Sequence, residues 1–361
     1  MYVLTHTGIN KILGSMPVYH LTHLDLSYHF MGVEGLQVLE DVMHKDMLES
    51  IQNLIFHNCL TCDPDINGAV LTTFLAAVST HCLQLRPLDL SGNNVGIPGA
   101  QSLQQASKLS QPHLSLSLNR TTLGDEGLRA FAQGDWNLNK LDLQGNSVHA
   151  KGILSLAESI GSGKCGVRYL VLDDNSLRLD GSRAVGEMLS RSSNSKLSAV
   201  SLAQCKLTHE DSSQPKKRDV AVQLFQARQN DNITELHMDE NDFAGESMYI
   251  LAGFLHLCPK IEFFYSTYCG IFSKDIKCLV DLLPSLQLGW SEMKFWQLDH
   301  NMIDDSAVPE CLAVVLLRMS VSLDSNLISK GMAKKIWMVS DIMTSDKLAA
   351  CTIHYSIFFI L

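Results

Sequence analysis

LNKLDLQGN, residues 138–146, is the stretch of sequence that indicates the fold of this chain. Its leucines alternate with polar residues, as expected of a strand that buries one of its faces. Asn146 ends the stretch, Gly152 follows six residues later, and Leu156 lies four residues beyond the glycine. The segment therefore predicts a short strand, a turn and a helix.

The same pattern recurs along the chain as L-x-x-L-x-L-x-x-N/C-x-L. Further close copies begin at Leu21, Leu85 and Val167. Degenerate copies begin at Ile51, His113, Leu197, Ile233, Ile261, Met293 and Arg318. The repeat is about 30 residues long, which leaves roughly twenty residues for a helix and two turns after each strand. The predicted unit is β-loop-α.

Each position of the repeat has a physical role. The Asn position turns the chain off the strand and can satisfy backbone groups in the turn; it holds Asn93, Asn146, Asn175, Asn241 and Asn301, with Cys59, Cys205 and Cys269 in the same place. The glycine six residues later lets the helix pack closely on the strand layer. Apolar strand residues should stack in one core column, for which Leu24, Leu90, Leu143 and Leu172 are expected.

This pattern resembles the leucine-rich repeats of the ribonuclease-inhibitor type, as in ribonuclease inhibitor, NOD-like receptors, CARMIL proteins and Ran GTPase-activating protein. The resemblance covers about residues 21 to 318. From Leu197 onward the glycine position holds other residues, namely Asp211, Ser247, Asp275 and Ala307. The resemblance implies an α/β horseshoe solenoid, with parallel strands on the concave face and helices on the convex face.

The expected organisation is one solenoid with capped ends. Residues 1–20 are expected to form an N-terminal capping segment, residues 21–318 about ten repeats, and residues 319–361 a degenerate last repeat and C-terminal cap. The repeats from Ile51 and Leu197 are longer than the others. Each should carry a surface loop, around CDPDING and THEDSSQPKKRD respectively.

Composition narrows the function classes. The 361 residues include 28 Lys+Arg and 38 Asp+Glu, a formal net charge of −10, and 46% are hydrophobic. This argues against a disordered chain and against a general binder of nucleic acid or anionic membranes. No apolar run approaches the ~18 residues of a membrane span. The ten cysteines have no regular spacing, which favours reduced thiols and a cytoplasmic protein.

Motifs for catalysis or metal binding are weak. IGSGKCG at 160–166 lacks the phosphate-loop glycine, because Glu158 stands there, and has Cys165 in place of Ser or Thr. It is interpreted as the end of a helix. Cys59 and Cys62 form a CxxC without a second pair, so no metal is expected. No local catalytic motif is found. The prediction is a protein without enzymatic activity and without a cofactor.

The outward strand positions predict the binding site. Acids predominate there and face a single Arg120, and tyrosines add aromatic area. The expected partner is a protein with a basic surface, rather than a nucleic acid or membrane. The predicted contacts are Asp142, Asp173, Asp174, Asp239, Glu240, Tyr265, Tyr268 and Asp299. The simpler interpretation is that solvated strands need polar residues in any case.

Two alternative functions follow from the resemblance alone. A protein of the Ran GTPase-activating type would stimulate a small GTPase through an exposed arginine. A sensor fragment of a NOD-like innate immune receptor would bind without turnover.

Overall fold

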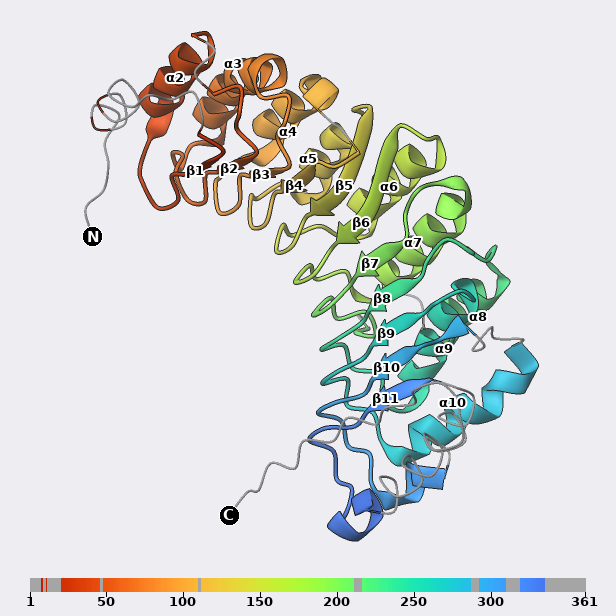
Figure 1. Ribbon diagram of the computed structural model, residues 1–361. Coiled ribbons are helices and arrows are strands. Elements are labelled where there is room, and N and C mark those ends of the chain that lie inside the picture. The colour runs from red at the N-terminus through yellow and green to blue at the C-terminus, as the bar shows by residue number, and fades with distance from the viewer. Residues whose placement is uncertain are drawn as a thin grey trace. The chain divides into compact units, whose positions relative to one another are not determined.

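The computed structural model has strands and helices that alternate along the chain (Figure 1). It describes residues 21–334 except 46–47, 110–111, 211–215, 287–291 and 310–318, together with residues 8 and 11. The caps expected within 1–20 and beyond 334 thus fall almost wholly outside the described residues. The chain divides into two compact units. The first is Met1–Asn175 with Ser195–Leu197, and the second is Ser176–Asn194 with Ser198–Leu361.

The first unit repeats a strand and a helix. Its strands are β1 (His23–Asp25), β2 (Asn53–Ile55), β3 (Pro87–Asp89), β4 (Ser115–Ser117), β5 (Trp136–Asp142) and β6 (Cys165–Val171). Its helices are α2 (Gly32–Met43), α3 (Pro64–His81), α4 (Gly96–Gln105), α5 (Gly124–Phe131) and α6 (Ala150–Gly161). Consecutive strands pair in parallel.

The second unit repeats the same elements. It begins with α7 (Arg178–Arg191) and continues with β7 (Ala199–Ser201), α8 (Lys217–Gln226), β8 (Glu235–His237), α9 (Met248–Leu257), β9 (Phe263–Tyr265), α10 (Ser273–Leu286), β10 (Phe295–Gln297) and β11 (Ser320–Ser322). Strands β7 to β11 pair in parallel and in chain order.

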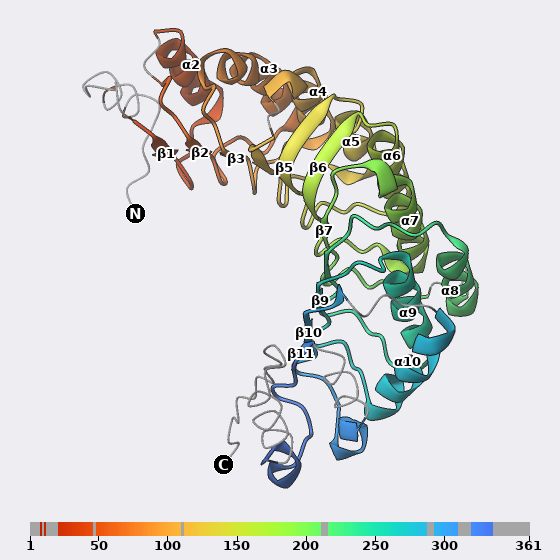
Figure 2. The same cartoon turned by 45° about the vertical axis from the view of Figure 1, so that its right-hand side comes forward.

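In each unit the strands form one layer and the helices the other (Figure 2). Neighbouring strands lie about 4.8 Å apart, whereas packed helices need about 8–10 Å. Each unit therefore curves with its strands on the inner, concave side and its helices on the convex side. The predicted α/β solenoid architecture is confirmed.

The strand register shows two buried columns rather than one. Leu24 pairs with Leu54, which pairs with Leu88 in the next strand. Leu143 lies two residues further along its strand, in a second column. The expectation of a single column that joins Leu24 to Leu90 and Leu143 is therefore wrong in its first member. Leu24 is also only half-buried.

The glycine position is explained by a contact near each helix start. A Cβ on Gly99 would lie 2.4 Å from Val95 Cγ1, and one on Gly181 would lie 2.4 Å from Leu177 Cβ. Val95 and Leu177 are both buried. The glycine thus leaves room for the apolar residue that precedes it by four positions. That apolar residue packs in the core and so holds the turn against it.

The expected loop at CDPDING is mostly a helix instead. Helix α3 begins at Pro64 and has 18 residues, against 10 in α4. Asp63 Oδ1 accepts hydrogen bonds from the backbone of Asp65 and Ile66, and Pro64 occupies the first helical position. This is a favourable helix start, so the extra residues lengthen the helix.

The second expected loop is partly helix as well. Lys217 and Arg218 lie in the first turn of α8 rather than in a loop, and residues 211–215 are not among those described. The turn interpretation of IGSGKCG is confirmed. Gly161 ends α6, and Gly163 adopts a left-handed conformation with φ of 79°.

The Asn position builds a ladder of buried hydrogen bonds. Asn175 Nδ2 donates to the carbonyls of Leu143 (3.0 Å) and Leu172 (2.8 Å). Its Oδ1 accepts from the backbone N–H groups of Asn146 (3.0 Å) and Val148 (2.9 Å). The side chain therefore ties each turn to the turn of the preceding repeat, as the sequence predicts.

Cysteine replaces asparagine in this ladder by donating from its thiol. Cys59 Sγ donates to the carbonyl of Leu26 at 2.8 Å, and Cys269 Sγ donates to that of Met238 at 3.3 Å. A thiol has one donor and no amide oxygen, so it satisfies the preceding carbonyl but not the N–H groups. The ladder continues in the next repeat with Asn93, whose Oδ1 accepts hydrogen bonds from the N–H groups of Cys59 and Leu60, both at 2.8 Å.

Candidate functional site

The turn that ends each strand exposes one residue at the strand face. In the described repeats the residue before the Asn position has a positive φ: Tyr28, Asn58, Gly92, Arg120, Gly145, Asp174, Gln204, Glu240, Tyr268, His300 and Ser325. A left-handed conformation costs a non-glycine residue roughly 1–2 kcal/mol. Backbone bonds to the next repeat hold it, such as Tyr28 N–H to the carbonyl of His57 at 2.8 Å. These positions form a column of projecting side chains in each unit, which is interrupted only at Gly92 and Gly145 among the described repeats.

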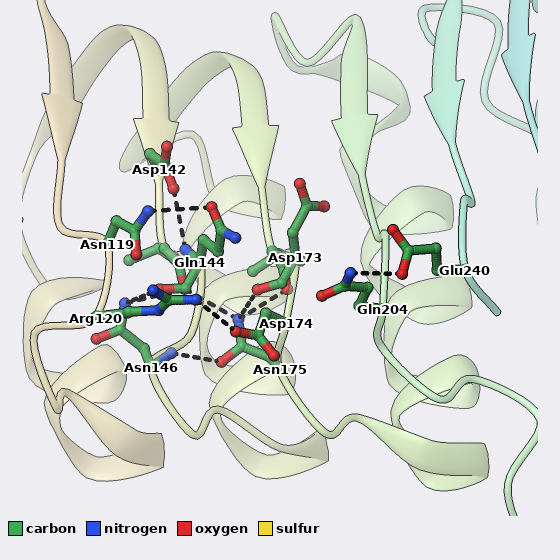
Figure 3. Close-up of polar contacts among 12 residues, drawn as sticks. Asn119, Arg120, Asp142, Gln144, Asn146, Asp173, Asp174, Asn175, Gln204 and Glu240 are labelled. Atoms are coloured by element: carbon green, nitrogen blue, oxygen red, sulfur yellow. Dashed lines mark hydrogen bonds and ion pairs between the residues drawn. The ribbon is translucent and has the colours of Figure 1, made fainter. Parts of the chain in front are cut away.

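In the first unit the predicted acids meet basic side chains. Arg120 lies 3.3 Å from Asp174, and Gly145 is the turn residue of the repeat between them (Figure 3). Lys140 lies 3.9 Å from Asp142. Asp173 is half-buried. The expectation of a single basic residue, Arg120, among these acids is thus wrong, since Lys140 also faces them.

The second unit presents a stacked pair of rings on its strands. His237 and Tyr265 lie parallel, with ring centroids 4.1 Å apart and an interplanar angle of 2°. His237 Nε2 lies 2.7 Å from Glu235 Oε1, and its Nδ1 lies 3.9 Å from Asp239 Oδ2. Burial first, and then the carboxylates of Glu235 and Asp239, raise the pKa of the Tyr265 hydroxyl above its usual value. The ring of Phe295, on the next strand, has its centroid 5.8 Å from that of Tyr265.

A second stacked pair lies in the turns of the same repeats. Tyr268 and His300 have ring centroids 4.2 Å apart and an interplanar angle of 6°. Tyr268 is 57% exposed, so the pair faces solvent. Glu240 precedes Tyr268 in the column of projecting side chains and accepts a hydrogen bond from Gln204 Nε2 at 2.6 Å (Figure 3). Gln204 is neutral, so this bond leaves the charge of Glu240 uncompensated.

Two predicted acids support the turns. Asp239 Oδ1 accepts the backbone N–H of Thr267 at 2.7 Å. Asp299 is only 7% exposed, and its carboxylate accepts hydrogen bonds from Ser322 Oγ (2.6 Å), from the backbone N–H of Asp324 (2.8 Å) and from Gln297 Nε2 (2.7 Å). The expectation that Asp299 projects outward is therefore not met. Its hydrogen bonds give it a structural role.

Sequence reasoning missed the residues that precede the first buried strand position. Lys140, Glu235, Phe263 and Phe295 all lie there, and the period of two places them on the same face as the residue two positions later. That alternation could have found them.

The described residues contain no group of three or more His, Cys, Asp or Glu side chains that could hold a metal ion. Cys59 and Cys62 differ sharply, since Cys59 is buried and Cys62 is exposed. Within the described ranges, no helix combines the length and the apolar character needed to cross a membrane.

The thiols should react in the order of their exposure. Burial raises the pKa of Cys59 and Cys82 to about 11 and that of Cys165 to about 12. At pH 8 we expect iodoacetamide to label Cys62 within minutes and these three only after unfolding, because the thiolate is the reactive form. Peptide mass spectrometry of the native and denatured protein measures this.

The same pKa shifts give a direction for pH dependence. A raised thiol pKa stabilises the fold fully below the unfolded pKa of about 9, and this contribution is lost as the pH rises through 11. In the labelling experiment, rapid reaction of Cys59 in the native protein would contradict the expected order and show that its turn opens.

Comparison with known proteins supports the repeat assignment. A model of leucine-rich repeats matches residues 20–39, 81–103, 111–132 and 137–157. TLR13, solved in a TLR13–ssRNA13 complex, is 15% identical with a TM-score of 0.50 over 85% of this chain, which spans 36% of that protein. LegL7 of Legionella pneumophila, a leucine-rich repeat-containing protein, is 16% identical with a TM-score of 0.49, covering 82% of this chain and 86% of that one.

An internalin of Listeria monocytogenes, inlF, is also similar. It is 14% identical with a TM-score of 0.46, and the match covers 99% of this chain and 95% of that one. At such identities a structural likeness shows the fold alone. The matched family model, the β-loop-α units and the asparagine ladder agree with one another. The four matched stretches, which lie between residues 20 and 157, are therefore leucine-rich repeats, and β-loop-α units of the same kind continue beyond them.

Proposed function

We propose that this protein is a non-catalytic scaffold or regulator that binds a protein partner with a basic surface through the strand face of its repeats. The observation that carries the proposal is the arrangement of acids in the second unit. Asp239 pairs with an imidazole and Glu240 with a neutral amide, whereas Asp142 and Asp174 in the first unit lie beside Lys140 and Arg120. A basic partner would gain most from the acids of the second unit.

A protein is a better partner than a nucleic acid on charge. The solved complex of TLR13 contains ssRNA, which is a property of that protein. In this chain the net charge is −10 and carboxylates line the strand face, so phosphates would be repelled. We also infer that the repeats are of the ribonuclease-inhibitor type, since they are about 30 residues long and an α-helix follows each of the strands β1 to β9. We place the protein in the cytoplasm, because the thiols of Cys59 and Cys269 serve the ladder in their reduced form.

Exchange of the acids tests the proposal. A partner captured from cell lysate is identified by mass spectrometry, and its affinity for the full chain is then measured by calorimetry at two salt concentrations. Asp239→Asn with Glu240→Gln is expected to weaken binding roughly fivefold to tenfold, since each charge contact at a protein surface contributes up to about 1 kcal/mol. The effect should shrink as salt rises.

The control uses the acids of the first unit. Asp142→Asn with Asp174→Asn removes the same charge, but these carboxylates already have basic neighbours, so a loss of less than about twofold is expected. Equal losses in the two double variants, or an affinity that ignores salt, would move the interface away from the second unit. Faster GTP hydrolysis by a small GTPase in the presence of the chain would instead support an activating protein.

A further inference from the structure

Aromatic and histidine rings of the second unit form a surface that is bordered by serines. We call it the aromatic ridge; it comprises His237, Phe263, Tyr265, Phe295, Tyr268 and His300. On one side His237 is registered with Ser201 of β7, and on the other Phe295 is registered with Ser320 of β11. Because serine is small, the ring stack stands above the strands on either side of it.

Carboxylates accompany the ridge along its length. Glu235 pairs in register with Phe263, and Glu240 lies in the turn column beside Tyr268. Asp239 has a hydrogen bond from Thr267 through one oxygen, which leaves its second oxygen toward His237. The ridge thus combines two groups that bind cations: the faces of aromatic rings, and carboxylates that form ion pairs.

This combination fits arginine better than lysine. A guanidinium group is planar, stacks on aromatic faces, and forms two parallel hydrogen bonds with a carboxylate. An ammonium group has a compact charge and cannot stack. Nucleobases also stack on rings, but the carboxylates beside the ridge would repel their phosphates.

We propose that the aromatic ridge binds an extended arginine-bearing segment of a protein, with guanidinium groups stacked on its two ring pairs and paired with the neighbouring carboxylates. The inference rests on the proposed function, because it specifies the basic partner. Tyr265 and Tyr268 are three residues apart, so their backbones lie at most about 10 Å from each other. Two arginines three positions apart in a polyproline-type segment lie about 9 Å apart on one face, which is within this limit.

The test uses the full chain and a short labelled peptide rich in proline and alanine, with two arginines three positions apart. We compare its affinity, by fluorescence anisotropy, with that of a twin in which both arginines are lysine and with that of a single-stranded RNA of similar length. The arginine peptide should bind at least about threefold more tightly than the lysine twin, and the RNA should not compete.

Two tyrosine variants locate the contact. Tyr268→Ala should weaken binding of the arginine peptide about two- to fivefold, the loss of one exposed contact between a cation and a ring. Tyr28→Ala is the matched control, since Tyr28 is 55% exposed, has the same left-handed turn position and lies 5.1 Å from His57. It should leave the affinity unchanged. Both side chains are exposed, so both variants should keep the melting temperature of the parent.

The outcomes separate this inference from the proposed function. Equal binding of the two peptides, equal losses in the two tyrosine variants, displacement by RNA, or no peptide binding would overturn the ridge as an arginine site. If the captured partner still depended on Asp239 and Glu240, the scaffold function would stand without it. If the peptide bound as expected while the captured partner ignored those acids, the proposed interface would fall and the ridge would remain.

Discussion

Leu143→Asp is expected to abolish folding of the first unit. Leu143 is 0% exposed, and its N–H donates to the carbonyl of Val171 at 2.9 Å, so the new carboxylate would lie in an apolar column. The variant loses about 1.5–3 kcal/mol of apolar burial and gains an unpaired buried charge, which adds several kcal/mol. The total approaches the whole stability of a typical domain. Circular dichroism and urea denaturation measure it.

The loss should extend beyond one repeat, because each repeat of a solenoid is stabilised by its neighbours. Hydrogen exchange should therefore show loss of protection in β4 and β6 as well as in β5. Leu327→Asp is the matched control; Leu327 is 63% exposed, so the same exchange should cost less than about 0.5 kcal/mol. A stable, fully protected Leu143→Asp protein would falsify the packing described here.

Asn175→Ala is expected to cost about 3–4 kcal/mol. The substitution removes four buried hydrogen bonds, two donated to the carbonyls of Leu143 and Leu172 and two accepted from the N–H groups of Asn146 and Val148. Each is worth about 1 kcal/mol net, and backbone groups left unpaired in the core add to the cost. The shift of the urea midpoint at constant slope measures the loss.

Two further variants distinguish the stability lost with the asparagine ladder from the stability lost on removing any side-chain amide. Asn175→Cys should recover part of the stability, because Cys59 in the same position donates to the carbonyl of Leu26. Asn119→Ala should cost less than about 1 kcal/mol, since the partly buried Asn119 side chain donates to Gln144 Oε1 at 3.1 Å and spans no turn. Equal costs for Asn175→Ala and Asn119→Ala would contradict a special role for the ladder.

Much of the fold could be predicted because the copies of the repeat within this one sequence can be compared with one another. Leu141, Asn146 and Gly152 recur at the same offsets in several copies, so each role was visible more than once in one sequence. The beginning of α3 was harder to predict. Asp63 and Pro64 are typical of both turns and helix starts. Such a pair indicates a helix rather than a turn only when the apolar face of a helix follows it. That face lies further on, at Leu71 and Phe74.

The site could be predicted only in outline. Alternation along a strand places Asp142 and Asp239 on the solvent side, but it does not reveal which carboxylates have partners. Asp299 is buried because Ser322 and Asp324 donate to it, and both come from the next, highly degenerate repeat. The stacking of His237 on Tyr265 depends on ring rotation, which the periodicity of a sequence does not describe.

The column of left-handed turn residues determines how this surface can be imitated or recognised. Glu240, Tyr268 and His300 are successive members of the column, yet 28 and 32 residues of chain separate them. Neighbouring members are brought to about the spacing of strands, ~4.8 Å, only while the repeats are stacked. A linear fragment cut from any one repeat carries a single member of the column. An antibody against this face would therefore recognise a discontinuous epitope that disappears on denaturation, and a peptide mimic would need side chains gathered from several repeats.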